Sequence, residues 1–329
     1  MGDRTAIQWT DSTINPFRAR LSAHPNKVGH YCEKISPGCK NCYASEMQLF
    51  RFGLLEFTLP NRPLVDLFLD HTKLEQVLRL QRPRKIFWCD MTDIFYEGYP
   101  NEWIDRCIAT MMAAEHHTHQ ILTKRTKRMR EYFNAPDLFD RLRAAANRCP
   151  DGSASDLGHP NIVTLAAPNV RKAFKMGAIN SFGRMRLPAP NIWIGASMEN
   201  QEAVDQRMPD LLGTKASVRF VSAEPLLGPI DLGPIHLPGV PHLDWVIVGG
   251  ESGPKARPCN LEWIESLVEQ CRAARVAPFV KQVGAKPVDG TGDKAYKPPK
   301  DHKGGEISEW SPSIQVREFP HAEGTRANL

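Results

Sequence analysis

The stretch KIFWCDMTD (residues 85–93) decides the fold, because a short apolar run is followed at once by polar residues. Apolar runs of this length are typical of strands that are buried on both faces of a parallel sheet. The pattern returns five times, in HQILTKR (119–125), NIWIGASMEN (191–200), VRFVSAEPLL (218–227), DWVIVGGES (244–252) and PFVKQVG (278–284). Six such segments indicate a protein of the α/β class.

The segments between these runs favour helices. Helical patterns are found in NEWIDRCIATMMAAEHH (101–117), NQEAVDQRMPDLL (200–212) and NLEWIESLVEQCRAARV (260–276). Asn260 is a suitable N-cap for the last of them. DSTINPFRA (11–19) adds a candidate first strand. The alternation predicts a partial (β/α)6-type parallel barrel, with a doubly wound open sheet as its main rival.

Two segments interrupt the alternation. Residues 145–190 hold Gly, Pro and basic residues and are too long for an ordinary connection. We expect an insertion there, between the third and fourth strands and over the barrel mouth. Residues 285–329 are polar and rich in Pro and Gly. We therefore expect a barrel domain over residues 1–284 and a C-terminal extension over 285–329 that wraps the surface or is partly mobile.

The composition is that of an ordinary globular protein. Of the 329 residues, 41% are hydrophobic and 24% charged, which argues against widespread disorder. The formal net charge of +5 permits an anionic partner without requiring one. No apolar run approaches the roughly 18 to 20 residues that cross a bilayer, and the first residues lack a secretory pattern. We expect a cytoplasmic protein without a membrane partner.

Polar side chains follow each predicted strand. Barrel enzymes build their sites at the carboxyl ends of strands, so these side chains should line one cavity. A strand must also end somewhere polar, which is the simpler explanation for any single position. The candidates are Asp90, Thr92, Asp93, Thr123, Lys124, Arg125, Ser197, Glu199, Asn200, Ser222, Glu224, Glu251, Lys281 and Gln282.

Three cysteines stand close together in GHYCEKISPGCKNCYASE (29–46). Cys32, Cys39 and Cys42 have the spacing C-x6-C-x2-C, while the other five cysteines are scattered. Eight cysteines are too few for a disulfide scaffold in a chain of this length. The spacing is compatible with two metal sites, or with three cysteines that bind no metal. One is a zinc site completed by His30, and the other is a 4Fe-4S cluster whose fourth iron is left open for a small ligand.

The ordered motifs QWTDSTINPF, SPGCKNCYA, DMTDIF, ILTKR, GASMENQEAVDQR, FVSAEPLLGPI, DWVIVGGESGPKARP and VKQVG carry a family resemblance. They resemble a phage and prophage three-cysteine family of the radical S-adenosylmethionine superfamily, allied to spore photoproduct lyase. The resemblance covers nearly the whole chain except residues 145–190 and the tail. It implies a 4Fe-4S cluster on Cys32, Cys39 and Cys42, and S-adenosylmethionine as a ligand of the open iron. Such enzymes release a 5'-deoxyadenosyl radical that removes hydrogen from a substrate, and an electron donor such as flavodoxin or ferredoxin supplies the electron.

The chain departs from the superfamily in ways that affect the cofactor site. The usual spacing is C-x3-C-x2-C, and the position before the third cysteine, commonly aromatic, is Asn41 here. Tyr43 follows and is expected near the adenine. The superfamily's Gly-Gly-Glu motif ends the second strand, where this chain has Asp90, Thr92 and Asp93 as candidates for the same task. Ser197 and Glu199 resemble ribose-contacting positions.

The substrate prediction combines charge with the resemblance. LTKRTKRMR (122–130) places Lys124 and Arg125 after the third strand, where they suit a phosphate, although such a run is as often a solvated helix face. Residues 145–190 add basic residues interleaved with Phe174 and Phe182, which suits nucleic acid. Glu224, Glu251, Lys281 and Gln282 are further substrate contacts, unless they form a buried polar network.

Relatives in phages rebuild thymine in viral DNA, and a base inside a duplex must be extruded before a buried site can reach it. The resemblance therefore implies an isomerase of glycyl-thymidine in DNA hypermodification, acting on DNA or on a modified nucleotide. One alternative is a photoproduct-type repair lyase with Cys89 or Tyr96 as hydrogen donor. The others are a zinc-stabilised nucleic-acid-binding protein and a structural phage component. The oligomeric state is not predicted.

Overall fold

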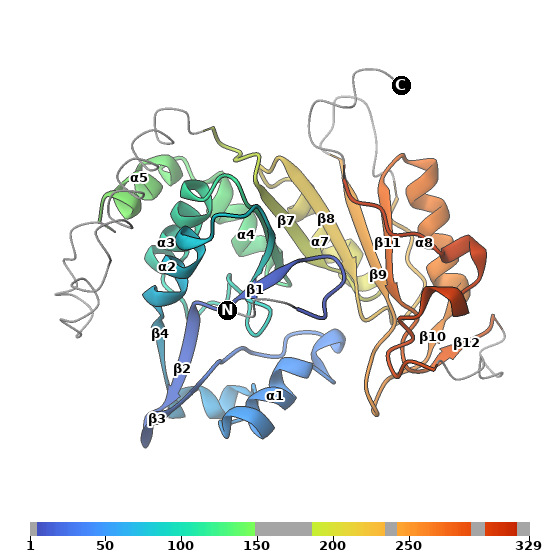
Figure 1. The fold of residues 1–329 in the computed structure, drawn as a ribbon, viewed down its shortest axis with the longest axis horizontal. Helices are drawn as coiled ribbons and strands as arrows, with labels where there is room; N and C mark the ends of the chain where they lie inside the picture. Colours follow the sequence, from blue (N-terminus) through green and yellow to red (C-terminus); the bar gives the residue numbers. More distant parts are fainter. Residues whose placement is uncertain (1–4, 149–185, 234–241, 291–299, 321–329) are drawn as a thin grey trace. The chain divides into compact units, whose positions relative to one another are not determined.

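The computed structural model describes residues 5–148, 186–233, 242–290 and 300–320, coloured along the chain in Figure 1. All six strands predicted from the apolar runs are present. They are β5 (Lys85–Trp88), β6 (Thr118–Thr123), β7 (Ile192–Ser197), β8 (Val218–Ala223), β9 (Trp245–Gly249) and β11 (Ala277–Gln282). The candidate first strand is confirmed as β1 (Ser12–Ile14).

These seven strands form one sheet with the order β1-β5-β6-β7-β8-β9-β11. The pairs β1–β5, β5–β6, β8–β9 and β9–β11 are parallel. Each strand therefore neighbours the next strand of this sheet along the chain. A doubly wound sheet would reverse its order at a switch point, so the rival fold is wrong. The sheet is open, with β1 and β11 at its edges, and the parallel α/β class is confirmed.

The three predicted helices are also present, with shorter bounds. They are α3 (Asn101–Ala113), α7 (Gln201–Leu212) and α8 (Leu261–Ala273). The side chain of Asn260 accepts a hydrogen bond from the amide of Glu262 at 2.9 Å, which confirms the predicted N-cap of α8. Asn200 caps α7 in the same way through the amide of Ala203 at 3.0 Å. Helix α8 lies beside β11, where its apolar face is buried (Figure 1).

Further elements lie outside the predicted alternation. An antiparallel sheet of order β3-β2-β4 is built from β2 (Phe17–Leu21), β3 (His24–Gly29) and β4 (Val65–Leu69), and a small parallel pair from β10 (Cys259–Asn260) and β12 (Pro287–Val288). The other α-helices in the described ranges are α1 (Tyr43–Phe52), α2 (His71–Arg79), α4 (Thr126–Asn134) and α5 (Leu138–Arg148). The short 3-10 turns are η1 (Pro37–Cys39), η2 (Leu59–Leu64), η4 (Ile307–Glu309) and η5 (Pro312–Ile314). None of the helices in the described ranges is long and apolar enough to span a membrane.

The chain divides into two compact units. The first unit comprises residues 1–34, 42–193 and 215–217, and the second comprises 35–41, 194–214 and 218–329. Each has a buried apolar core, which includes Trp88 in the first unit and Phe220 and Trp245 in the second. The described part of the tail belongs to the second core. Trp310 is 5% exposed, and the amide of Val280 in β11 donates to the carbonyl of Val316 at 2.9 Å.

The predicted insertion over residues 145–190 lies mostly outside the described residues, because positions 149–185 are not among them. The basic and aromatic side chains that we expected there, including Phe174 and Phe182, are likewise outside. Helix α5 ends at Arg148, directly before this segment.

Candidate functional site

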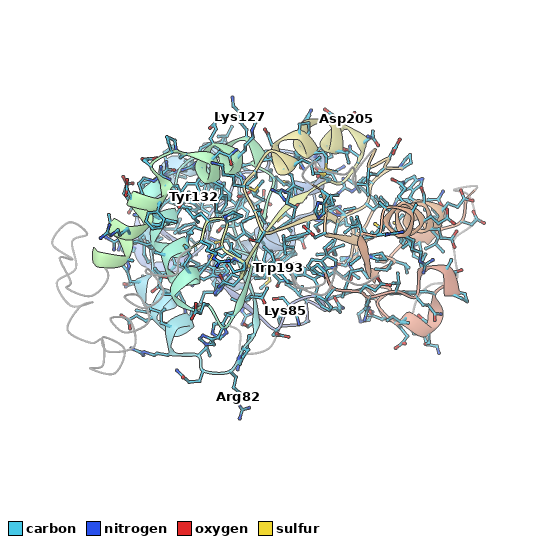
Figure 2. All side chains as sticks on the ribbon, turned by 90° about the horizontal axis from the view of Figure 1, so that it is seen from above. Arg82, Lys85, Lys127, Tyr132, Trp193 and Asp205 are labelled. Atoms are coloured by element: carbon cyan, nitrogen blue, oxygen red, sulfur yellow. The ribbon has the colours of Figure 1, made fainter. Side chains whose placement is uncertain are left out.

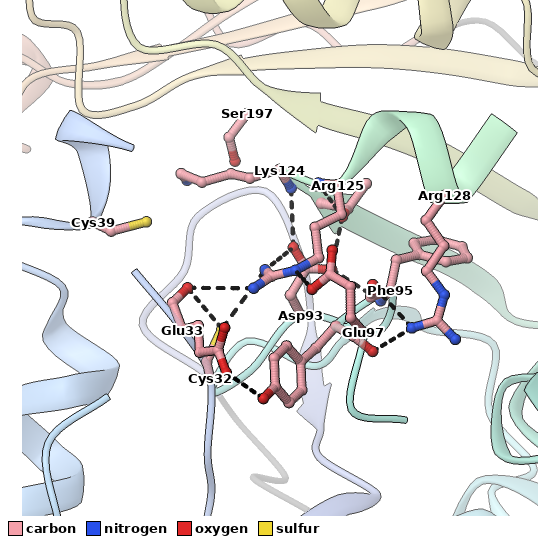
Figure 3. Close-up of polar contacts among 12 residues, drawn as sticks. Cys32, Glu33, Cys39, Asp93, Phe95, Glu97, Lys124, Arg125, Arg128 and Ser197 are labelled. Atoms are coloured by element: carbon pink, nitrogen blue, oxygen red, sulfur yellow. Dashed lines mark hydrogen bonds and ion pairs between the residues drawn. The ribbon is translucent and has the colours of Figure 1, made fainter. Parts of the chain in front are cut away.

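Arg125 is the centre of a polar cluster in the first unit, which we name the Arg125 cluster: Cys32, Glu33, Asp93, Tyr96, Glu97 and Arg125 (Figure 3). The Arg125 side chain is only 4% exposed, yet its guanidinium has partners on several sides. It donates to Asp93 Oδ2 at 3.3 Å, to Glu97 Oε2 at 2.7 Å and to the Glu33 carbonyl at 3.4 Å. One guanidinium nitrogen lies 4.0 Å from the Cys32 sulfur.

The electrostatics of this cluster favour a charged guanidinium. Burial alone would lower the pKa of Arg125, but the charges of Asp93, Cys32 and Glu97 outweigh it, so the pKa is raised. The Arg125 guanidinium therefore brings a positive charge close to the Cys32 sulfur.

Asp93 organises the turn that follows β6. Its carboxylate accepts hydrogen bonds from the hydroxyl of Thr123 at 2.7 Å, the amide of Phe95 at 2.9 Å and the amide of Lys124 at 3.0 Å, besides the bond from Arg125. A carboxylate offers about four acceptor positions, and these donors use them. In this structure Asp93 therefore holds the protein's own turn, although the sequence suggested a cofactor contact.

Tyr96 and Glu33 complete the Arg125 cluster. The Tyr96 hydroxyl donates to Glu33 Oε1, and the Arg125 guanidinium lies over the Tyr96 ring at 5.1 Å from its centroid. Burial and the hydrogen bond to Glu33 raise the pKa of Tyr96, so the phenol stays protonated. Glu33, the residue after Cys32, is therefore held at two points. Tyr96 binds its carboxylate and Arg125 binds its backbone carbonyl.

The basic residues that follow β6 differ in their burial and in their hydrogen-bond partners. Arg128 donates to the carbonyls of Phe95, Tyr96 and Tyr99, so its guanidinium holds the loop that follows β5. Lys127 is exposed and points away from the protein (Figure 2). The Lys124 side chain is half-buried, and within the described part of the chain no hydrogen bond or ion pair holds its ammonium. Of the two predicted phosphate ligands, Arg125 is thus committed to internal partners and Lys124 is available.

Asp90 and Tyr43, two of the expected cofactor contacts, lie together in the first unit. The Tyr43 hydroxyl donates to the backbone carbonyl of Asp90 at 2.6 Å. The Asp90 carboxylate accepts from Asn15 Nδ2 at 2.6 Å, and burial raises its pKa. Cys89 turns the chain here with a φ of 63°, which is uncommon for a residue with a side chain. Thr92 is half-buried in the same loop.

In the second unit, two carboxylates hold the segment that contains Cys39. Glu199 is 0% exposed, and its Oε1 accepts the amide of Gly38 at 3.1 Å while its Oε2 accepts Arg207 Nη1 at 2.8 Å. Arg207 also donates to the Ser197 carbonyl at 2.7 Å. The predicted ribose contact Glu199 is thus engaged by the protein itself, and Ser197 is buried beside it at the end of β7.

Glu251 is the second carboxylate. It accepts from the amide, Nε and Nη2 of Arg257 at 2.9, 2.9 and 2.6 Å, and from Asn41 Nδ2 at 3.1 Å. Burial would raise the pKa of Glu251, but the hydrogen bonds from Arg257 and Asn41 prevail and lower it. Arg257 also donates to the carbonyl of Pro37 at 2.9 Å.

A third group lies at the ends of β8 and β11. The Lys281 ammonium is 2.5 Å from Glu224 Oε1, and Gln282 Nε2 donates to the same oxygen at 3.3 Å. Gln282 also donates to the Gly250 carbonyl at 3.1 Å. The predicted substrate contacts Glu224, Lys281 and Gln282 are therefore neighbours, and Glu251 is engaged elsewhere, by Arg257 and Asn41.

The three cysteines are half-buried and none is in a disulfide within the described ranges. Cys32 follows the loop after β3, Cys39 ends η1, and Cys42 is the N-cap of α1. Among the described residues, no group of three or more His, Cys, Asp or Glu side chains is arranged to hold a single metal ion. His30 donates to or accepts from no cysteine there. Its Nδ1 bonds the Phe17 carbonyl at 3.1 Å, and burial lowers its pKa to about 4.

Sequence reasoning missed six residues that complete these groups, namely Asn15, Glu33, Asn41, Glu97, Arg207 and Arg257. Glu33 and Asn41 stand beside a cysteine in the sequence, and Asn15 follows the first strand, so their positions gave a signal. Arg207 lies in the middle of α7, where the sequence gave none. The pairing of all these side chains depends on the fold.

The fold and these groups define a singly wound, parallel α/β protein with charged residues gathered at its strand ends. A family model described as a protein of unknown function (DUF5131) matches residues 4–312. The chain belongs to this family. No curated protein and no solved structure matches it.

Proposed function

We propose that this chain is a radical S-adenosylmethionine enzyme that rearranges a modified nucleobase, with isomerisation of glycyl-thymidine as the preferred reaction. The observation that carries the proposal is the C-x6-C-x2-C segment, whose thiols are half-buried and outside any disulfide. The partial (β/α)6 barrel belongs to the same proposal. The unreversed strand order supports it, because a barrel is wound in one direction only.

Three thiols with no fourth cysteine nearby suit a 4Fe-4S cluster with one open iron, as the family resemblance implies. His30, which would complete the zinc alternative, is buried, and its Nδ1 is bonded to the Phe17 carbonyl at 3.1 Å. The guanidinium beside Cys32 supplies positive charge near the ligands. Cys32, Cys39 and Cys42 would hold the cluster, which when bound supplies the electron that cleaves S-adenosylmethionine.

The polar groups at the strand ends would orient the cofactor and the substrate. Tyr43, the residue after Cys42, donates to the backbone carbonyl of Asp90, which supports a role for both residues beside the cofactor. Thr92 and Ser197 remain proposed cofactor contacts, and Asp93 and Glu199 would act through the turns that they hold. The half-buried Lys124 would bind a substrate phosphate, while Glu224, Lys281 and Gln282 form one polar group for the base or sugar.

The test is anaerobic reconstitution with iron and sulfide, reduction with dithionite in the presence of S-adenosylmethionine, and chromatography for 5'-deoxyadenosine. The wild type should bind about four irons and form 5'-deoxyadenosine. A Cys32, Cys39 and Cys42 triple-alanine variant should do neither. Cys271→Ala is the matched control, because it removes a thiol from α8, outside the segment, and should keep both properties. One tightly bound zinc with intact cofactor would overturn the proposal in favour of nucleic-acid binding.

The substrate is tested with 5-glycyl-substituted thymidine, supplied as a mononucleotide and within duplex DNA. An isomerisation changes the retention of the product on chromatography and leaves its mass unchanged. Repair of a thymine photoproduct instead would identify the lyase alternative, with Cys89→Ala and Tyr96→Phe as the variants that distinguish its hydrogen donor. Lys124→Gln should raise the KM for a nucleotide about tenfold, whereas Lys127→Gln, which removes an exposed charge from the same run, should leave it unchanged.

A further inference from the structure

The Cys39 segment (residues 35–41) has little structure of its own. Its internal backbone hydrogen bonds are those from the amide of Cys39 to the Ser36 carbonyl at 2.9 Å and from Lys40 to the Pro37 carbonyl at 3.2 Å. Ile35 is 47% exposed, and η1 is only three residues long. A short exposed turn of this kind is normally mobile, so its position must come from contacts with other parts of the second unit.

Glu199 provides one such contact on the residue before Cys39. Its buried carboxylate has the amide of Gly38 on one oxygen and Arg207 on the other. A buried carboxylate needs hydrogen-bond donors in place of the water that it has lost, and the Gly38 amide is one of those donors here. A Cβ at position 38 would lie 3.0 Å from the Glu199 carboxyl carbon, so the approach is close enough to favour glycine.

Glu251 and Arg257 provide the other contacts, on both sides of Cys39. Arg257 holds the Pro37 carbonyl while it is paired with Glu251, and Glu251 in turn accepts from Asn41. Asn41 is held a second time, by the carbonyl of Lys255 at 2.9 Å. Positions 37, 38 and 41 are therefore each fixed by groups anchored at the ends of β7 and β9.

We infer that Glu199 and Glu251, with Arg207 and Arg257, are positioning residues that fix the Cys39 thiol before any iron is bound. The assignment of Cys39 as an iron ligand rests on the proposed function, whereas the fixing of the segment does not. Holding a ligand in place before binding removes the ordering cost that a mobile turn would otherwise add to metal uptake. The sequence suggested that Glu199 contacts ribose and that Glu251 contacts substrate. Here both carboxylates are instead assigned to hold the Cys39 segment in place.

The test uses the full metal-free chain. Hydrogen exchange of a peptide covering residues 35–41 and the alkylation rate of Cys39, both by mass spectrometry, are compared in wild type, Glu199→Gln and Arg257→Gln. Arg257 is partly exposed, so its variant is the safer one for folding. Glu269→Gln is the matched control, because it removes an exposed carboxylate from α8 of the same unit. Circular dichroism verifies that each variant is folded.

We expect about tenfold faster exchange over residues 35–41 and about tenfold faster alkylation of Cys39 in both variants, with no change in Glu269→Gln. Iron uptake during reconstitution should be slower in Arg257→Gln by a similar factor. Unchanged exchange and alkylation in folded Glu199→Gln and Arg257→Gln would overturn the inference. A wild type that binds no iron would overturn the proposed function alone, because the exchange result would still decide whether the carboxylates fix the segment.

Discussion

The two carboxylates on Arg125 allow a sharp test of how burial sets the strength of an ion pair. The Asp93 side chain is 9% exposed and the Glu97 side chain 66%, while both bind the same 4% exposed guanidinium. Removing one partner of a buried pair costs about 3–5 kcal/mol, because the other charge stays buried without compensation. An exposed pair contributes about 0–1 kcal/mol, because water and salt screen it.

We therefore expect Asp93→Asn to lower the free energy of unfolding by about 3 kcal/mol, at the low end of that range because Glu97 still pairs with Arg125. Glu97→Gln should cost about 0.5 kcal/mol. The assay is urea unfolding at neutral pH, followed by circular dichroism. With an m-value of about 3 kcal/mol/M, the midpoint of Asp93→Asn should fall by about 1 M, and that of Glu97→Gln by less than about 0.3 M.

The salt dependence provides an internal control for this comparison. Raising the ionic strength should abolish the small effect of Glu97→Gln and leave the effect of Asp93→Asn nearly unchanged, because buried pairs are screened little. Equal losses in the two variants would refute the reasoning, since they would mean that the exposed fraction does not decide the strength of these contacts.

Two further predictions concern the core. Gly195→Ala in β7 places a Cβ 2.4 Å from the ring of Phe220 in β8, so it should lower the free energy of unfolding, measured in urea, by about 1–3 kcal/mol. Gly228→Ala, whose Cβ would have its nearest atom at 4.0 Å, should change it little. His119 accepts a hydrogen bond from Trp88 Nε1 at 3.0 Å, and burial lowers its pKa to about 3. The folded state thus binds this proton less readily than the unfolded state, so stability is full above about pH 6.5 and falls as the pH drops toward 3. Between pH 6 and 4, His119→Gln should reduce the slope of unfolding free energy against pH by up to about 1.4 kcal/mol per pH unit, and an unchanged slope would contradict the assignment.

Strand positions were the part of the fold that local sequence could give. KIFW and WVIVG are short apolar runs typical of a strand with two buried faces, and both form interior strands of the sheet. The N-cap of α8 was predictable for a similar reason, because the Asn260 side chain bonds an amide two residues away. Contacts of this kind depend on neighbours in the chain, so the sequence contains all the information that they require.

The strand order and the antiparallel sheet β3-β2-β4 were not predictable in this way. FRARL in β2 lies just after the first strand, and the sequence predicts one continuous strand over residues 11–19, yet β2 pairs with β3 and β4 instead. Whether a strand continues one sheet or begins another depends on partners far along the chain. The unreversed order, which excluded the doubly wound fold, is likewise a property of those pairings.

For the candidate site, the sequence by itself determined which residues carry chemistry: three thiols in an eleven-residue segment and polar side chains after every strand. Only the tertiary structure decided what each polar side chain touches. Arg125 looked like a phosphate ligand and is buried between Asp93 and Glu97, while Glu199 and Glu251 hold the turn that carries Cys39. The physical reason is that a charge removed from water must find its partner in space, and that partner can be more than a hundred residues away, as Gly38 is from Glu199.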